Sequence, residues 1–145
     1  MAQNTIIVST IDGGPIQKEW IMDAVVMPGQ LVEYASSTRI QMLSATVAPI
    51  MRVVVENGED DTSVSGTYES GAQVPFVTPV RGDIVMVYAS ASAASTISAT
   101  DVVYGNGAGF VHGGTALAGT QGLGTALATT VLTANQRVQI QVEVL

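Results

Sequence analysis

The last nine residues read Arg137-Val138-Gln139-Ile140-Gln141-Val142-Glu143-Val144-Leu145, and apolar and polar side chains alternate along them up to Val144. Successive side chains of a β-strand point to opposite faces of the sheet. The four β-branched residues of this segment would therefore share one buried face, and the two glutamines and Glu143 would share the other. This pattern predicts a long strand and indicates a mainly β fold.

Two further segments predict strands. Residues 50–56 are apolar around Arg52 and end at Asn57-Gly58, a dipeptide typical of tight turns. Residues 83–89 are almost continuously apolar, which indicates a central strand buried on both faces. Weaker strands are predicted at 20–27, 31–34, 74–78, 101–104 and 110–112. Short strands separated by frequent turns are typical of a small β-barrel or a sandwich.

The start of the chain predicts an extended N-terminal arm, residues 1–19, ahead of a single β-rich domain, residues 20–145. Asp12-Gly13-Gly14-Pro15 is a cluster of turn-forming residues that would separate the two. The arm contains Ile6-Ile7-Val8, and three β-branched residues in an extended segment favour pairing with the sheet edge of another chain.

Small residues dominate two other stretches, residues 90–95 and 113–130, and predict loops there. The second stretch is rich in glycine, alanine and threonine and contains Gly-Thr-Ala-Leu-Ala twice, starting at Gly114 and at Gly124. Such residues bury little surface by themselves. The repeat is therefore either a pair of short related strands or a loop that packs against a partner, and both interpretations stay open.

Composition and charge argue against several classes of protein. The chain carries 5 Lys and Arg against 12 Asp and Glu, and this net charge of −7 argues against direct binding to nucleic acid. Lys18 is the only lysine, so there is no polybasic patch for a membrane, and no apolar run is long enough to span one. Without cysteine there are no disulfides or thiolate metal sites. The first ten residues lack the features of an export signal.

Residues suited to catalysis are sparse, and we expect neither an enzyme nor a cofactor or metal site. His112 is the only histidine, and no metal-binding or nucleophile motif surrounds it. Glu59-Asp60-Asp61 lacks the order of a calcium loop and is interpreted as a solvated loop. Gly105-Asn106-Gly107-Ala108-Gly109 lacks the lysine and the helix of a phosphate-binding loop and indicates a tight turn. Arg81-Gly82-Asp83 matches the tripeptide of integrin ligands but leads into an apolar strand, which favours a turn.

Several short motifs follow one another along the chain. A proline-glycine turn precedes two apolar residues and an acid. An aromatic residue, a glycine and a valine then precede a glycine-aspartate turn and an apolar strand, and a glycine-rich region and the alternating strand close the pattern. These motifs are Met27-Pro28-Gly29-Gln30-Leu31-Val32-Glu33, Tyr68, Gly71, Val74, Gly82–Val87, Gly105–Gly114 and Arg137–Leu145. In this order they resemble the small capsid decoration, or cement, proteins of tailed bacteriophages, although Arg81 stands where that family has proline.

The resemblance implies a small β-barrel or β-tulip-like domain without an active site. It further implies a structural virion protein that binds the outer surface of an icosahedral phage capsid as a homotrimer. Such a trimer clamps neighbouring major capsid subunits and stabilises the shell against the pressure of the DNA inside. The implied partners are the major capsid protein and other copies of the chain. The implied location is the outer capsid surface, after synthesis in the host cytoplasm.

Apolar residues of the arm and of the repeat are the candidates for contact with the shell or with other copies of the chain. Each contact would be weak, and repetition at many sites would make attachment cooperative. Trp20, where the arm meets the domain, is either a core residue or an anchor buried on a neighbouring subunit. The candidate interface residues are Ile6, Ile7, Val8, Ile11, Ile16, Trp20, Thr115, Leu117, Leu123 and Leu127.

Two other functions remain open on the residues alone. The first is a receptor-binding or carbohydrate-binding β-module of a virion, such as a head fibre, for which Tyr104 beside Asn106 is the one suitable cluster. The second is a small hydrolase that uses Glu59, Asp60 or Asp61 together with His112. Few residues support the second function.

Overall fold

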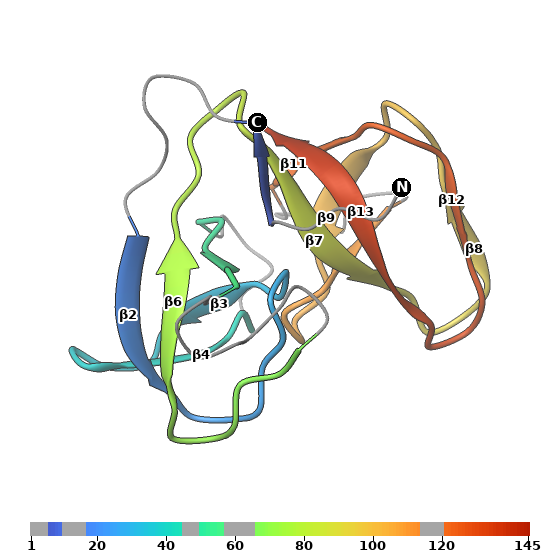
Figure 1. Ribbon diagram of the computed structural model, residues 1–145. Helices are drawn as coiled ribbons and strands as arrows, with labels where there is room; N and C mark the ends of the chain where they lie inside the picture. The colour runs from blue at the N-terminus through green and yellow to red at the C-terminus, as the bar shows by residue number, and fades with distance from the viewer. Residues whose placement is uncertain (1–5, 10–16, 45–49, 57–65, 114–120) are drawn as a thin grey trace.

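The computed structural model describes residues 6–9, 17–44, 50–56, 66–113 and 121–145. Within these ranges the chain forms thirteen β-strands and no helix (Figure 1), which confirms the mainly β prediction. The strands are β1 (Ile7–Ser9), β2 (Gln17–Met22), β3 (Val32–Tyr34), β4 (Arg39–Met42), β5 (Val53–Val54), β6 (Gln73–Val77), β7 (Ile84–Ser90), β8 (Ser95–Ile97), β9 (Val102–Gly105), β10 (Val111–His112), β11 (Gly124–Ala126), β12 (Thr130–Leu132) and β13 (Arg137–Val144).

Five strands close into a barrel. They follow one another in the order β7-β10-β9-β11-β13, and β13 pairs with β7 again. The β7–β13 ladder runs from Arg137 opposite Ser90 to Glu143 opposite Ile84, and Figure 1 shows the two strands side by side. β1 pairs with β7 in addition, outside this ring. The predicted small β-barrel is therefore confirmed.

The barrel is built from the two segments with the strongest strand patterns. Along β13, Ile140, Val142 and Val144 are buried and Glu143 is exposed, as the alternation predicts. Along β7, residues 85–87 are buried in succession. β13 lies on one side of β7, and β1 and β10 lie on the other, so β7 is central as expected. The barrel core consists of isoleucine, leucine, valine, methionine and alanine.

A second sheet of five strands has the order β3-β4-β2-β6-β5. It curls until its two edges meet at a bridge between Leu31 and Val53. The amide of Val32 supports this bridge by donating to the carbonyl of Arg52 at 2.9 Å. Its core includes the aromatic ring of Phe76 together with aliphatic side chains. The chain thus forms two adjoining curved sheets. The core cluster of the barrel extends to Val53 and Val77 of the second sheet, and a smaller cluster lies within the second sheet itself.

The Pro28-Gly29 turn joins the two sheets. The amide of Gly29 donates to the carbonyl of Val54 at 2.8 Å, and the carbonyl of Gly29 accepts from the amide of Tyr88 in β7 at 3.0 Å. Gly29 has a φ of +97°, a conformation that residues with a side chain rarely adopt. The proline-glycine motif found in the sequence therefore lies at the junction of the two sheets.

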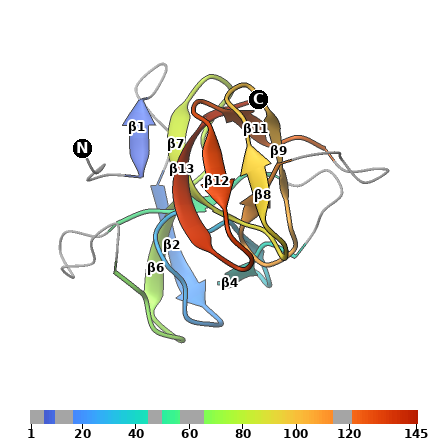
Figure 2. The ribbon, with the colours of Figure 1, turned by 90° about the vertical axis from the view of Figure 1, so that its right-hand side faces the viewer.

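β8 and β12 form a two-stranded ribbon apart from both sheets. Ile97 and Leu132 are buried against the barrel core, whereas Val131 is 71% exposed. Figure 2 shows the ribbon in front of the barrel. β7 ends at Ser90 and β8 begins at Ser95, so the serine-alanine stretch is the connection between them, as expected.

Several strand boundaries differ from those expected. β5 is shorter than the strand predicted at 50–56, and β2 begins at Gln17 and ends at Met22 instead of covering 20–27. The second copy of the repeat forms β11, between β9 and β13, while the copy from Gly114 lies outside the described residues. Small residues fit in β11 because a Cβ atom at Gly124 would overlap Val142.

Of the segment expected to form an arm, residues 1–19, the structure describes 6–9 and 17–19. Both pieces pair with strands of the same chain, β1 with β7 and the start of β2 with β6. Ile6 is completely buried in the barrel core, and its amide donates to the Glu56 carboxylate at 3.0 Å. The described part of this segment therefore belongs to the folded body.

Candidate interface surfaces

The candidate interface residues fall into three groups. Those whose side chains lie outside the described part of the chain are Val8, Ile11, Ile16, Thr115 and Leu117. Ile6 and Leu123 are buried in the barrel core, and Ile7 packs against it. Trp20 is half-buried, and Leu127 is 39% exposed. Leu127 and Trp20 therefore both leave surface for contact with another molecule.

Trp20 belongs to an aromatic cluster in the second sheet. The centre of its ring lies 4.4 Å from that of Tyr34 and 6.3 Å from that of Phe76. The guanidinium carbon of Arg52 lies 4.2 Å from the centre of the Tyr34 ring, a distance at which cation and ring attract each other. Lys18 Nζ donates to the Tyr34 hydroxyl at 3.5 Å. Sequence reasoning identified Trp20 but missed the others, because they come from different strands.

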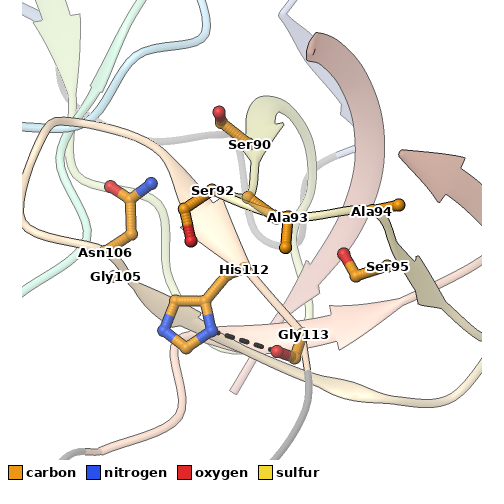
Figure 3. A pocket seen from close by; sticks show the side chains of 10 residues that line it. Ser90, Ser92, Ala93, Ala94, Ser95, Gly105, Asn106, His112 and Gly113 are labelled. Atoms are coloured by element: carbon orange, nitrogen blue, oxygen red, sulfur yellow. Dashed lines mark hydrogen bonds between the residues drawn. The ribbon is translucent and has the colours of Figure 1, made fainter. Parts of the chain in front are cut away.

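His112 lines a hollow of about 480 Å³ next to the barrel. Figure 3 shows Asn106, Ser92 and His112 grouped around it. His112 Nδ1 lies 3.0 Å from the carbonyl oxygen of Gly113. The described lining contains no carboxylate; it consists of Ser90, Ala91, Ser92, Ala93, Ala94, Ser95, Gly105, Asn106, His112 and Gly113. The acids considered as catalytic partners of His112, Glu59, Asp60 and Asp61, lie outside the described residues.

The cluster considered for carbohydrate binding is divided between two places. Tyr104 in β9 lies opposite His112 in β10, with ring centres 6.0 Å apart, and it is not part of the lining of the hollow. Asn106 Oδ1 accepts from the amide of Ala108 at 3.0 Å, and the amide of Asn106 donates to the carbonyl of Phe110 at 3.0 Å. The glycine-rich segment is thus a tight turn, as expected.

Arg81-Gly82-Asp83 also forms a turn. Asp83 is completely buried, and its carboxylate accepts from the amide of Val80 at 3.0 Å. The carbonyl of Asp83 accepts from the amide of Val144 at 2.9 Å and so ties the start of β7 to the end of β13. An integrin ligand displays this aspartate on an exposed loop, so the turn interpretation is confirmed.

The described ranges offer neither a cluster of metal-binding side chains nor a membrane-spanning helix. No group of three or more His, Cys, Asp or Glu residues there could hold a metal ion. The described residues form no helix that is long and apolar enough to cross a membrane. What remains as candidate functional surface is the aromatic cluster, the hollow beside His112 and a groove.

The groove has a volume of about 610 Å³ and is mainly apolar. Two methionines, Met27 and Met42, are part of its lining, and methionine side chains are flexible and adapt their shape to different contacts. The guanidinium carbon of Arg137 lies 5.0 Å from the centre of the Phe110 ring. Sequence reasoning missed the groove because its lining comes from both sheets and their loops. The lining consists of Val25, Met27, Gln30, Met42, Thr67, Ala108, Phe110 and Arg137.

Comparison with known proteins finds a likeness only at the level of structure. No protein-family model matches the chain, and no curated protein matches it. Among solved structures, the crystal structure of the head fibre gp8.5 N base of bacteriophage phi29 is similar, with a TM-score of 0.53 and 13% sequence identity. The similarity covers 90% of this chain and 97% of that one. The two chains therefore share a fold over nearly their whole lengths.

Proposed function

We propose that this chain is a structural protein of a bacteriophage virion and that it binds the outer surface of the head. One observation carries the proposal, the similarity in fold to a phage head fibre base over 90% of this chain and 97% of the other. The sequence motifs resemble the capsid decoration proteins of tailed phages and support the same class independently. The chain would be made in the host cytoplasm and then added to the shell.

In its finer form, the proposal is that a homotrimer clamps neighbouring major capsid subunits and so stabilises the shell. Exposed apolar side chains are available for such contacts at Ile21, Val25, Ile50, Val80, Leu127, Val131 and Leu145. Contacts of this kind are individually weak, and three copies that bind together gain affinity through multivalency. Neither catalysis nor a cofactor is part of the proposed function.

The alternative is a receptor-binding or carbohydrate-binding module of a virion, such as a head fibre. The observation in its favour is that the similar structure is itself the base of a head fibre. The hollow beside His112 is polar enough for a sugar, but Tyr104 does not line it, so the described lining offers no aromatic face for stacking. We therefore rank shell binding first.

Heads of the phage that encodes this chain, assembled without it, provide the test. Purified chain is added back, the bound copies are counted by quantitative mass spectrometry, and the temperature of head disruption is measured. A decoration protein should bind in hundreds of copies and raise that temperature. A fibre base should bind in far fewer copies and leave the temperature unchanged. Failure to bind the heads at all would contradict both forms of the proposal.

A further inference from the structure

Alternation along the strands gathers four side chains at one end of the second sheet. Residues two apart on a strand share a face of the sheet. Lys18 and Trp20 therefore share the face of Met22, while Tyr34 shares that of Val32 and Arg52 that of Val54. These three inward-facing residues, Met22, Val32 and Val54, are completely buried. We call Lys18, Trp20, Tyr34 and Arg52 the cationic end, and its side chains range from half-buried to exposed.

Contacts within the cationic end hold Arg52 in place. Its guanidinium carbon lies 4.2 Å from the centre of the Tyr34 ring, and Trp20 lies 4.4 Å from the same ring centre. Arg52 Nε is buried and has no hydrogen-bond partner among the described residues. Nε itself is closed to a second molecule, but a guanidinium carries five N–H donors in all, and the others can donate to an acceptor. The side chain as a whole is only partly buried, which leaves it reachable for a second molecule.

The charge of the chain makes this cluster unusual. The chain has a net charge of −7 and only 5 Lys and Arg, and two of these contact the Tyr34 side chain, Arg52 at its ring and Lys18 at its hydroxyl. Elsewhere in the described part, Arg39 forms an ion pair with Asp23, and Arg137 lies over Phe110. Lys18 and Arg52 form no ion pair with a described carboxylate. The cationic end is therefore a positive site on an otherwise acidic protein.

We propose that the cationic end binds an acidic segment of a partner protein, with Arg52 and Lys18 donating to its carboxylates. The Tyr34 ring, itself packed against Trp20, restricts the guanidinium of Arg52, so less rotamer freedom is lost when the partner binds. The mouth of a curved sheet is a common position for a binding site. The inference rests on the proposed function, because it assigns the chemistry of the surface that the major capsid protein would offer.

The same observations disfavour two other kinds of partner, a carbohydrate and a nucleic acid. A sugar ring stacks on a free aromatic face, but an indole and a guanidinium already lie this close to the centre of the Tyr34 ring. Nucleic acid needs several phosphate contacts, and the rest of the chain repels it with its net negative charge. A guanidinium over the Tyr34 ring and an ammonium group at the Tyr34 hydroxyl match one or two carboxylates of a peptide.

Trp20 makes the test direct, because it is the only tryptophan of the chain and lies in the site. A hexaglutamate peptide is titrated into the full chain while tryptophan emission is recorded, and a hexaglutamine peptide is the control. Lys18→Gln and Arg52→Gln each remove one charge from the site. Arg81→Gln removes the same charge from an exposed turn at the start of β7 and is the matched control.

We expect saturable binding of hexaglutamate, no binding of hexaglutamine, and weaker binding at higher salt. Lys18→Gln and Arg52→Gln should each weaken binding about tenfold, and Arg81→Gln less than about twofold. Lys18 is exposed, so its substitution keeps the test valid even if Arg52→Gln fails to fold. Three results would overturn the inference: no saturable binding, an equal loss in Arg81→Gln, or tighter binding of a heparin hexasaccharide than of hexaglutamate.

Failure of the inference can be told apart from failure of the proposed function. If Lys18→Gln binds heads as well as the unsubstituted chain does, the shell is bound elsewhere and the inference is wrong, while the proposed function stands. If hexaglutamate binds at the cationic end but the chain does not bind heads, the site is correct and the proposed function is wrong.

Discussion

The barrel and the second sheet are built from similar short strands but are filled and closed differently. The barrel has an entirely aliphatic core and is closed by the β7–β13 ladder. The second sheet is closed by one bridge, between Leu31 and Val53, and contains Phe76 and Tyr68 in its core. At its end, Arg52 stacks on an exposed aromatic residue, Tyr34. This contrast teaches that one chain can combine a barrel closed by a long ladder with a second sheet that leaves aromatic and cationic side chains accessible at its end.

The largest effect is expected where the barrel is most tightly closed. A Cβ atom at Gly124 would overlap Val142 and would come within 2.7 Å of the carbonyl oxygen of Glu143. Gly124→Val should therefore lower the free energy of unfolding by about 3 kcal/mol or more, measured by urea denaturation. Gly71→Ala is the control. A Cβ atom at Gly71 would meet open space, but the φ of +87° is unfavourable for alanine, so this substitution should lower the free energy of unfolding by about 1–2 kcal/mol. Equal losses would mean that the barrel is not tightly packed at β11.

A matched pair of substitutions compares the two cores. Val142 in the barrel and Val74 in the second sheet are both completely buried. Val142→Ala and Val74→Ala should each cost about 2 kcal/mol. Both should shift one common transition, because the Gly29 turn ties the sheets together. Trp20 emission reports the second sheet and circular dichroism reports both sheets, so transitions at different urea concentrations would show two independent units.

A single buried hydrogen bond distinguishes the second core further. The hydroxyl of Tyr68 donates to the carbonyl of Val55 at 2.8 Å in a buried position. Tyr68→Phe removes this donor and leaves the carbonyl without it, so the free energy of unfolding should fall by about 1 kcal/mol. Tyr104→Phe, on the half-buried strand β9, is the comparison and should change stability less. An unchanged stability in Tyr68→Phe would mean that water replaces the hydroxyl.

The smallest effect is expected at the surface of the second sheet. Arg39 and Asp23 form an ion pair, and both side chains are substantially exposed. Exposed pairs contribute little, because water and salt screen the charges. Asp23→Asn should therefore change the free energy of unfolding by less than about 0.5 kcal/mol in urea denaturation. A larger loss would show that this pair fixes β4 against β2.

The sequence predicted the strands with long apolar patterns and missed those whose pairing is distant. The alternation of apolar and polar residues was sufficient to predict β13, and a continuous apolar run was sufficient to predict β7. The strand β11 consists of Gly124-Thr125-Ala126, and small residues carry no strand pattern of their own. β4 lies in parallel beside β2, a pairing that local sequence does not encode.

The candidate surfaces were harder to predict than the barrel, for a related reason. Trp20 was recognised as a core residue or an anchor, and it lies half-buried against the second core. Its neighbours Tyr34 and Arg52 stand far from it in the sequence, and strand register brings them together. Register is poorly determined by short strands. Ile6 and Leu123 were proposed as contact residues, but they pack inside the barrel, because apolar side chains alone do not reveal which face is buried.

The most direct measurement of the central proposal is electron cryomicroscopy of heads of the encoding phage, with and without this chain. We predict additional density on the outer surface of the shell, grouped in threes, into which the two adjoining sheets fit with the cationic end against an acidic region of the capsid subunit. Identical shells in the two samples, or density only inside the head, would contradict it.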